Sequence, residues 1–136
     1  MTMRTIKFRG KNIHTGEWSY GNLAQFDNGC CVDDVTVDRS TVGQFIGMLD
    51  SHGKEIYEGD ILRSPLDNIV VVKFGYKEHI VKHGVFTDSF AAYGWIVENV
   101  KNGITDFLDN EFLQGEVIGN IHDNPEMLKG GSNGES

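Results

Sequence analysis

The chain has 136 residues, of which 39% are hydrophobic, and it carries a formal net charge of -8. This length is enough for one hydrophobic core and favours a single domain. The acidic charge argues against a general attraction to nucleic acid or to an anionic membrane surface, because phosphate contacts need clustered Lys and Arg.

The sequence carries no signal for export or for a membrane span. The N-terminal residues lack the apolar segment of a signal peptide, and no run approaches the roughly 18 apolar residues of a spanning helix. The cysteines are Cys30 and Cys31, whose side chains point to opposite faces of a strand, so they form no disulfide framework and no paired metal site. We therefore expect a cytoplasmic protein without membrane contact.

The N-terminal part of the chain reads as short strands joined by tight turns. The dipeptide of Asn28 and Gly29 is a strong hairpin signal, because both residues tolerate positive φ. Turns are predicted at residues 15–16, 28–29 and 33–34. Strands are predicted at residues 6–9, 18–23, 23–26, 30–32 and 35–37, with a connection at 38–41.

The central stretch, residues 44–62, predicts a hairpin whose loop ends at Gly53. On its returning strand, two adjacent apolar pairs, at residues 56–57 and 61–62, flank Gly59. A strand of period two cannot place both members of a pair on one face. We therefore predict a bulge at Gly59.

The C-terminal half predicts further strands and little helix. Three consecutive Val within residues 69–74 indicate a strand that is buried on both faces, and residues 102–103 turn a hairpin between 93–97 and 104–108. Residues 75–84 have no clear assignment, and 85–92 fit a strand or a short helix. A last strand is predicted at 116–120. Asn124 then serves as N-cap of a helical turn that begins at Pro125.

This pattern predicts a mainly β fold, either a small barrel or packed antiparallel sheets, with a short C-terminal helical turn. The segment at residues 58–62, followed by a loop and a Val-rich strand, is reminiscent of SH3-like barrels. We expect one domain over residues 1–129 and a flexible tail over 130–136.

Three stretches carry a resemblance to a known family: IleLysPheArg at residues 6–9, the central stretch, and GluValIleGlyAsnIleHisAspAsnPro at 116–125. Together they resemble the YopX family of phage and prophage proteins, whose biochemical function is unknown. The resemblance implies a mostly β protein made in an infected or lysogenic bacterium, with no assigned active site.

Three carboxylates lie close together in the central stretch. Glu58 and Asp60, with Glu55 nearby, offer an acid/base pair or a metal site built from carboxylates. The alternative is structural: Asp60 accepts backbone N–H groups in the turn while both Glu side chains are solvated. The turn context favours the structural interpretation.

The N-terminal strand concentrates basic residues: Arg4, Lys7, Arg9 and Lys11. Such a cluster can bind phosphates. It can also protect an edge strand against aggregation, and this is the interpretation we favour.

Other candidate groups carry weaker signals. His79 and His83 have the spacing of two zinc ligands on a helix, but no GluXaaXaaHis motif and no Cys pair accompanies them, so solvated histidines are favoured. No nucleophile elbow or phosphate loop is present. Several aromatics can form a stacking platform for single-stranded nucleic acid or belong to the core, and the acidic charge favours the core. They are Tyr20, Phe26, Tyr76, Phe86, Phe90, Tyr93 and Trp95.

With no catalytic constellation, we expect a non-enzymatic accessory protein that acts by binding in the cytoplasm of a bacterial host. The expected partners are further copies of the chain, as a homo-oligomer, and an unknown host or phage protein. No cofactor is expected. The alternatives are a small hydrolase that uses Glu58 and Asp60, and nucleic-acid binding through Arg9 and Lys11.

Overall fold

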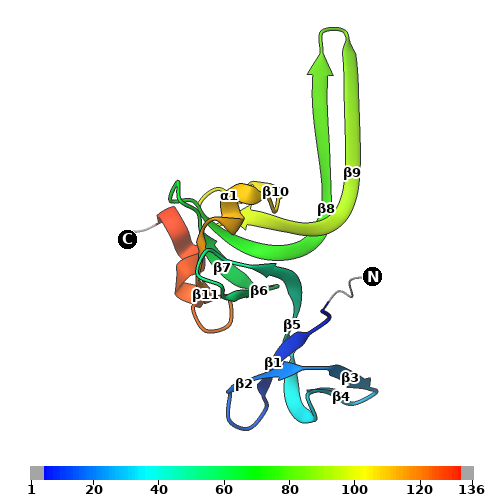
Figure 1. Cartoon of the computed structure of the whole chain (residues 1–136), viewed down its shortest axis with the longest axis vertical. Coiled ribbons are helices and arrows are strands. Elements are labelled where there is room, and N and C mark those ends of the chain that lie inside the picture. Colours follow the sequence, from blue (N-terminus) through cyan, green and yellow to red (C-terminus); the bar gives the residue numbers. More distant parts are fainter. Residues whose placement is uncertain (1–4, 133–136) are drawn as a thin grey trace.

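Tight turns divide the chain into strands that form two antiparallel sheets and a protruding ribbon (Figure 1). The structure, a computed structural model, describes residues 5–132. Its strands are β1 (Phe8–Asn12), β2 (Trp18–Gly21), β3 (Leu23–Phe26), β4 (Gly29–Val32), β5 (Val35–Leu49), β6 (Glu55–Tyr57), β7 (Asp60–Arg63), β8 (Ile69–His83), β9 (Phe86–Asn99), β10 (Thr105–Phe107) and β11 (Glu116–Asn120). The helices are α1 (Asn110–Leu113) and the 3-10 helix η1 (Pro125–Ser132).

The first sheet has the strand order β2-β1-β5-β4-β3, and β6 also pairs with β5. The two predicted hairpins, β1 with β2 and β3 with β4, are both present. The hairpin predicted at Asn28 and Gly29 is present. It was predicted because both residues tolerate positive φ, but neither of them has positive φ in the structure. Buried Cys30, Val32 and Val37 form the core of this sheet.

β5 is one strand of 15 residues, where the sequence predicted a strand at 35–37 and a connection at 38–41. The polar residues 38–41 were mistaken for a connection because they lie in a bulge of β5. Arg9 of β1 faces Gly43, and Lys11 faces Asp38, so a longer stretch of β5 is opposite a shorter stretch of β1. A bulge leaves polar residues unpaired while the strand continues.

At Glu58 and Gly59 the chain passes from the first sheet to the second. β6 pairs with β5, whereas β7 pairs with β8 and β11, so the predicted bulge within one strand is wrong: a turn separates two strands. Gly59 has φ 91°, its amide donates to the Val72 carbonyl at 2.8 Å, and its carbonyl accepts from the Ile121 amide at 3.0 Å. The turn is therefore held from two sides.

The second sheet has the order β10-β9-β8-β7-β11, and the larger core lies between this sheet, α1 and strands β5 and β6. As predicted, Val70, Val71 and Val72 of β8 are all buried. The core cluster consists of Ile46, Ile56, Leu62, Val70, Val72, Val97 and Phe112. Each sheet begins and ends with an edge strand in the described residues, so the packed-sheet form of the mainly β prediction is confirmed and the barrel form is not.

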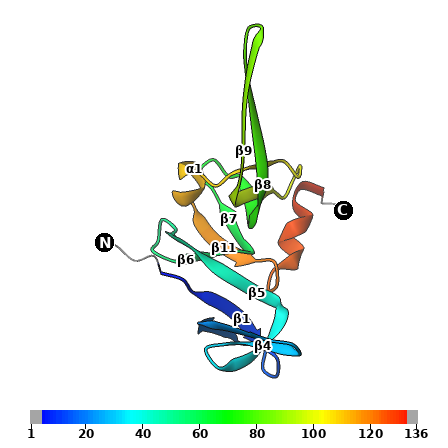
Figure 2. The same cartoon turned by 90° about the vertical axis from the view of Figure 1, so that its right-hand side faces the viewer.

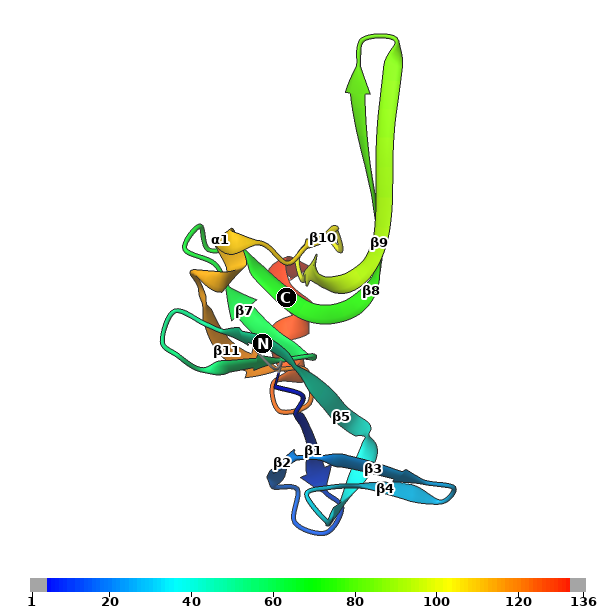
Figure 3. The ribbon, with the colours of Figure 1, turned by 45° about the vertical axis from the view of Figure 1, so that its right-hand side comes forward.

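β8 and β9 pair without interruption from Val70 opposite Asn99 to His83 opposite Phe86. Within the body β7 and β10 flank them, but from Gly75 and Gly94 outward no strand of residues 5–132 pairs with their outer edges. We call residues 75–94 the arm. Figures 1 and 3 show it leaving the body on the side away from the first sheet. Residues 75–84 have no clear assignment from sequence, and 85–92 fit a strand or a short helix; in the structure both segments are strand, joined by a turn.

The C-terminal part contains α1 and β11. The helix α1, which is N-capped by Asp109, was not predicted, whereas the strand β11 was predicted. The helical turn at Pro125 is confirmed as the 3-10 helix η1, on the opposite side of the second sheet from α1 in Figure 2. Asn124 does not cap η1 with its side chain, which accepts instead from the Asn120 amide at 3.2 Å. η1 reaches Ser132, within the segment expected to be a tail, and residues 133–136 lie outside the described part. None of the helices in residues 5–132 has the length and hydropathy to cross a membrane.

Candidate functional site

Arg9 of β1 and Asp60 of β7 form a buried ion pair that joins the two sheets. Arg9 Nη2 lies 2.8 Å from Asp60 Oδ1, and the two side chains are 6% and 1% exposed. The other oxygen, Oδ2, accepts the amide of Tyr57 at 2.7 Å, as the structural interpretation of Asp60 predicted. Both carboxylate oxygens are therefore engaged.

The surroundings of this pair hold the cation in place. The Arg9 guanidinium lies over the rings of Trp18 and Tyr57, at 4.5 Å and 4.9 Å from their centroids. Its contact with Asp60 is an ion pair rather than an aligned hydrogen bond, and its Nε has no hydrogen-bond partner. Burial raises the pKa of Asp60, and the charge of Arg9 offsets part of that rise.

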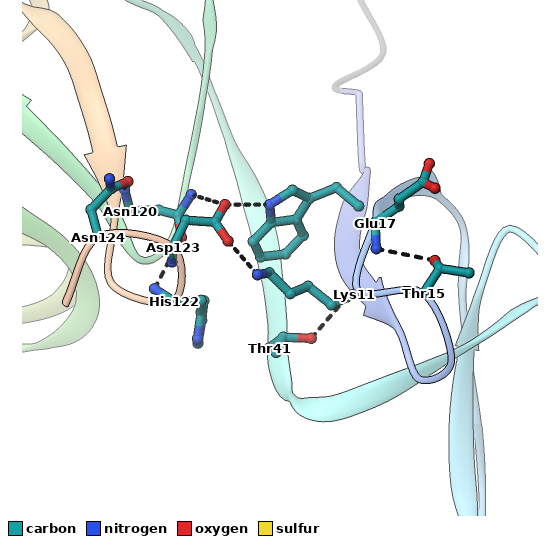
Figure 4. Close-up of polar contacts among 9 residues, drawn as sticks. Lys11, Thr15, Glu17, Thr41, Asn120, His122, Asp123 and Asn124 are labelled. Atoms are coloured by element: carbon teal, nitrogen blue, oxygen red, sulfur yellow. Dashed lines mark hydrogen bonds and ion pairs between the residues drawn. The ribbon is translucent and has the colours of Figure 1, made fainter.

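A second connection links the first sheet to the loop after β11 (Figure 4). Asp123 accepts from Lys11 Nζ and, at 2.8 Å, from Trp18 Nε1. The side-chain oxygen of Asn120 shapes the loop by accepting the amides of His122 and Asp123 at 3.0 Å and 2.9 Å. The hydrogen bonds from Lys11 and Trp18 hold the pKa of Asp123 well below its usual range. We call Arg9, Lys11, Trp18, Tyr57, Asp60 and Asp123 the inter-sheet cluster.

The predicted carboxylate site is not brought together. Asp60 is inside the inter-sheet cluster, whereas the half-buried Glu58 lines a cavity on the second sheet. Glu55 is not simply solvated, because it accepts from Lys7 Nζ at 2.8 Å and from Tyr57 Oη at 2.9 Å. Among the described side chains, no three His, Cys, Asp or Glu residues lie together as metal ligands would.

The three basic N-terminal residues that the structure describes are each paired with a carboxylate. Lys7 contacts Glu55, Arg9 contacts Asp60 and Lys11 contacts Asp123. β1 lies between β2 and β5, so the interpretation of these residues as protectors of an edge strand is wrong. Arg4 lies outside the described residues. The cluster that the sequence presents as a patch is thus distributed over three ion pairs.

The arm has an aromatic face at its base. Opposite residues of antiparallel strands share a face, and the ring centroids of Phe74 and Trp95 are 5.2 Å apart, while those of Tyr76 and Tyr93 are 5.3 Å apart. We call these four residues the aromatic ladder. Phe74, Tyr76 and Tyr93 are 55%, 53% and 75% exposed. Nothing in the described chain covers them.

The remainder of the arm mixes apolar and polar residues and has no formal net charge. Lys77 and Lys82 balance Glu78 and Asp88, so the two positive and two negative charges cancel, in a chain of formal charge -8. The aromatics were predicted to be core. This is wrong for Tyr76, Phe86 and Tyr93, because no layer of the described chain packs on the two-stranded ribbon, and it is also wrong for Tyr20 and Phe26, which are exposed on β2 and β3.

A cavity of about 340 Å³ opens where the turn at Glu58, the second sheet and η1 meet. The ion pair of Lys73 with Glu98 lies beside it. Its apolar lining comes from Val71, Val72, Val100, Ile121 and Leu128. The cavity therefore suits a ligand with an apolar group, which the lining would contact, and an adjacent cation, which would pair with Glu58.

The model of the YopX protein family matches residues 7–129. The chain belongs to this family. The resemblance predicted from the sequence is thereby confirmed, and the matched region includes the inter-sheet cluster, the arm and all the residues that line the cavity. No curated protein matches this YopX-family chain.

The sequence did not predict the arm of this YopX-family protein or its cavity. A signal for the arm exists in the even-numbered apolar residues Phe74, Tyr76 and Ile80, which lie on one face of β8. The backbone of His79 and His83 is in β8, so the helical spacing proposed for a zinc site does not apply. Their side chains lie outside the described part of the structure.

Proposed function

We propose that this YopX-family protein is a non-enzymatic binding protein of phage or prophage origin that assembles with copies of itself through the arm in a bacterial cytoplasm. The observation that carries the proposal is the exposed aromatic ladder on a ribbon that nothing in the described chain covers. Contiguous apolar surface of this kind marks interaction sites, and aromatic residues are enriched at them.

The energetics of the ribbon support a partner. An isolated two-stranded hairpin is at best marginally stable in water. Large aromatic side chains bury about 150–250 Å² each, so covering the exposed parts of Phe74, Tyr76, Phe86 and Tyr93 removes roughly 500 Å² from water. A stable interface buries about 800 Å² per partner. The ladder and the tip supply more than half of that area.

The charge distribution supports self-assembly at the arm. Two copies that each carry -8 repel one another. The arm is the formally neutral extension of this acidic chain, so contact there brings no like charges together. The free backbone edges of the arm add hydrogen-bonding capacity.

The alternatives have weaker support. Hydrolysis by Glu58 and Asp60 would need a free oxygen on Asp60, and both are engaged. Nucleic-acid binding through Arg9 and Lys11 would need these cations to leave Asp60 and Asp123. Base stacking on the aromatic ladder is chemically reasonable, but the neutral arm provides little attraction for phosphates.

Light scattering coupled to size exclusion tests the proposal. The wild type is expected to have a mass above that of the 15.2 kDa chain. The double variant Tyr76→Asp, Tyr93→Asp is expected at the monomer mass, because it would place unpaired charges on the face of the arm that makes the contact. Leu66→Asp is the matched control, since Leu66 is 72% exposed on a loop of the body. A wild type that stays monomeric at micromolar concentration overturns the proposal, as does an arm variant that assembles like the control.

A further inference from the structure

We infer that the tip of the arm of one copy occupies the apolar cavity of the next copy, so that the copies join head to tail. The inference rests on the proposed self-assembly and adds the two surfaces that meet. The tip is Val85 with Phe86, at the turn where β8 and β9 are joined.

The tip is apolar where a solvated turn would be polar. Val85 is 92% exposed and Phe86 is 73% exposed, and Gly84 beside them has φ 62°. The glycine satisfies the turn, so Val85 and Phe86 are not needed for its backbone geometry. Two large apolar side chains at the end of a projection are suited to insertion into a pocket.

The cavity has the character that this tip requires. Its volume of about 340 Å³ is in the range of pockets that receive small apolar groups. Val71 and Val72 belong to the buried core at 5% and 0% exposure, so that part of the wall is rigid. Leu128 of η1 closes another side and is 40% exposed.

The tip cannot fill the cavity of its own chain. Lys73 lines the cavity, and the strand from there to Gly84 spans roughly 35 Å at about 3.3 Å per residue. Figure 3 shows the ribbon running away from the body along this length. The tip in the cavity must therefore come from another copy.

Charges beside the two surfaces are complementary. Glu58 lines the cavity, and Lys82 is three residues before the tip. Among the side chains that the structure describes, none forms an ion pair with Glu58 or Lys82. An inserted tip would bring Lys82 to the side of the cavity where Glu58 lies, which sets the direction of the arm.

A tip and a cavity are different surfaces, so the contact is heterologous. Such contacts close into rings when the rotation between neighbours permits, and otherwise extend as open chains. Each copy uses its tip once and its cavity once. A mutation can therefore disable the tip or the cavity of one copy without disabling the other.

The test mixes two variants of the full chain. Phe86→Asp disables the tip and leaves the cavity intact, and Leu128→Asp disables the cavity and leaves the tip intact. Each alone is expected at the monomer mass of 15.2 kDa. The equimolar mixture is expected to give a dimer of twice that mass, 2 × 15.2 = 30.4 kDa, because one functional tip and one functional cavity remain.

A charge exchange provides an independent readout. Glu58→Lys and Lys82→Glu are each expected to weaken wild-type assembly at least tenfold, and the double variant is expected to restore most of it. Leu66→Asp serves as the control, and unchanged melting temperatures show that the exposed substitutions leave the fold intact.

The outcomes separate this inference from the proposed function. If the wild type assembles but Leu128→Asp assembles equally well, or the mixture stays monomeric, the tip does not enter the cavity and another part of the arm makes the contact. If the wild type is itself monomeric, the proposed function fails and the inference fails with it.

Discussion

Replacement of Asp60 by Ala is the sharpest test of how the two sheets are joined. The change removes the acceptor of the Tyr57 amide, and it leaves the Arg9 guanidinium 6% exposed with no counter-charge. The aromatic rings of Trp18 and Tyr57 remain as the favourable contacts of the cation.

The loss of the counter-charge of Arg9 makes the larger contribution to the change in the free energy of unfolding. An unsatisfied buried amide costs about 1–3 kcal/mol, and breaking a buried ion pair from one side costs about 3–5 kcal/mol. The rings of Trp18 and Tyr57 contact Arg9 before and after the change, so the guanidinium keeps these contacts and the loss stays near that of the broken ion pair. We expect Asp60→Ala to lower the free energy of unfolding by about 3–5 kcal/mol, a large part of the roughly 5–15 kcal/mol of a typical domain.

Urea unfolding of three variants separates the contributions. Asp60→Asn keeps an acceptor for the Tyr57 amide, so its loss measures the charge alone. The apolar pair Arg9→Met with Asp60→Leu removes both charges and is expected to be more stable than Asp60→Ala. A change below about 1 kcal/mol for Asp60→Ala would refute the reasoning. A rise in stability would instead indicate a site at which stability is traded for function.

Three further predictions concern the turn and the loop beside this cluster. Gly59→Val is expected to lower the free energy of unfolding by about 1–3 kcal/mol, since Val is strained at φ 91°, and thermal melting checks this. Glu58→Ala is expected to change the same quantity by less than about 0.5 kcal/mol, because no hydrogen bond of its side chain is seen; a larger loss in urea unfolding would show an unrecognised contact. Burial and the charges of Arg9 and Lys11 lower the pKa of His122 below 6.5, so the folded state binds a proton less tightly than the unfolded state. The contribution of neutral His122 to the free energy of unfolding is fully present above pH 6.5 and is lost as the pH falls through the lower folded pKa. Melting curves of His122→Gln on both sides of pH 6.5 should therefore show a smaller pH dependence than those of the wild type. An equal pH dependence would contradict the assignment.

The hairpins could be predicted because their turn chemistry is local. The turn at Asp33 and Asp34 has φ values of 53° and 67°, and Gly53 and Gly103 have φ of 82° and 72°. These positions need residues that tolerate positive φ, and the sequence supplies them at the points of reversal. Gly59 shows the limit of this reasoning. Its positive φ was recognisable, but whether it bulges one strand or separates two depends on which strands pair with each side.

The inter-sheet cluster could not be predicted because its members are far apart in sequence. Lys11 and Asp123 are separated by 112 residues, and Arg9 meets Asp60 only after β1 and β7 have taken their places in different sheets. A basic residue in a strand carries no information about which carboxylate will face it. The four N-terminal cations therefore read as a surface patch, whereas the fold pairs the three described ones with carboxylates.

The arm was missed for a different physical reason. Alternation of apolar and polar residues arises when one face of a strand packs on a core, and the arm packs on no core within its own chain. The even-numbered residues of β8 place Phe74, Tyr76 and Ile80 on one face of the arm, but the charged Glu78 interrupts this apolar series. A charged residue is tolerated there because solvent reaches both faces of the arm. A two-stranded ribbon with polar residues would satisfy the backbone equally well. The fold of one copy does not explain these aromatic and β-branched side chains, whereas the proposed burial against a second copy would.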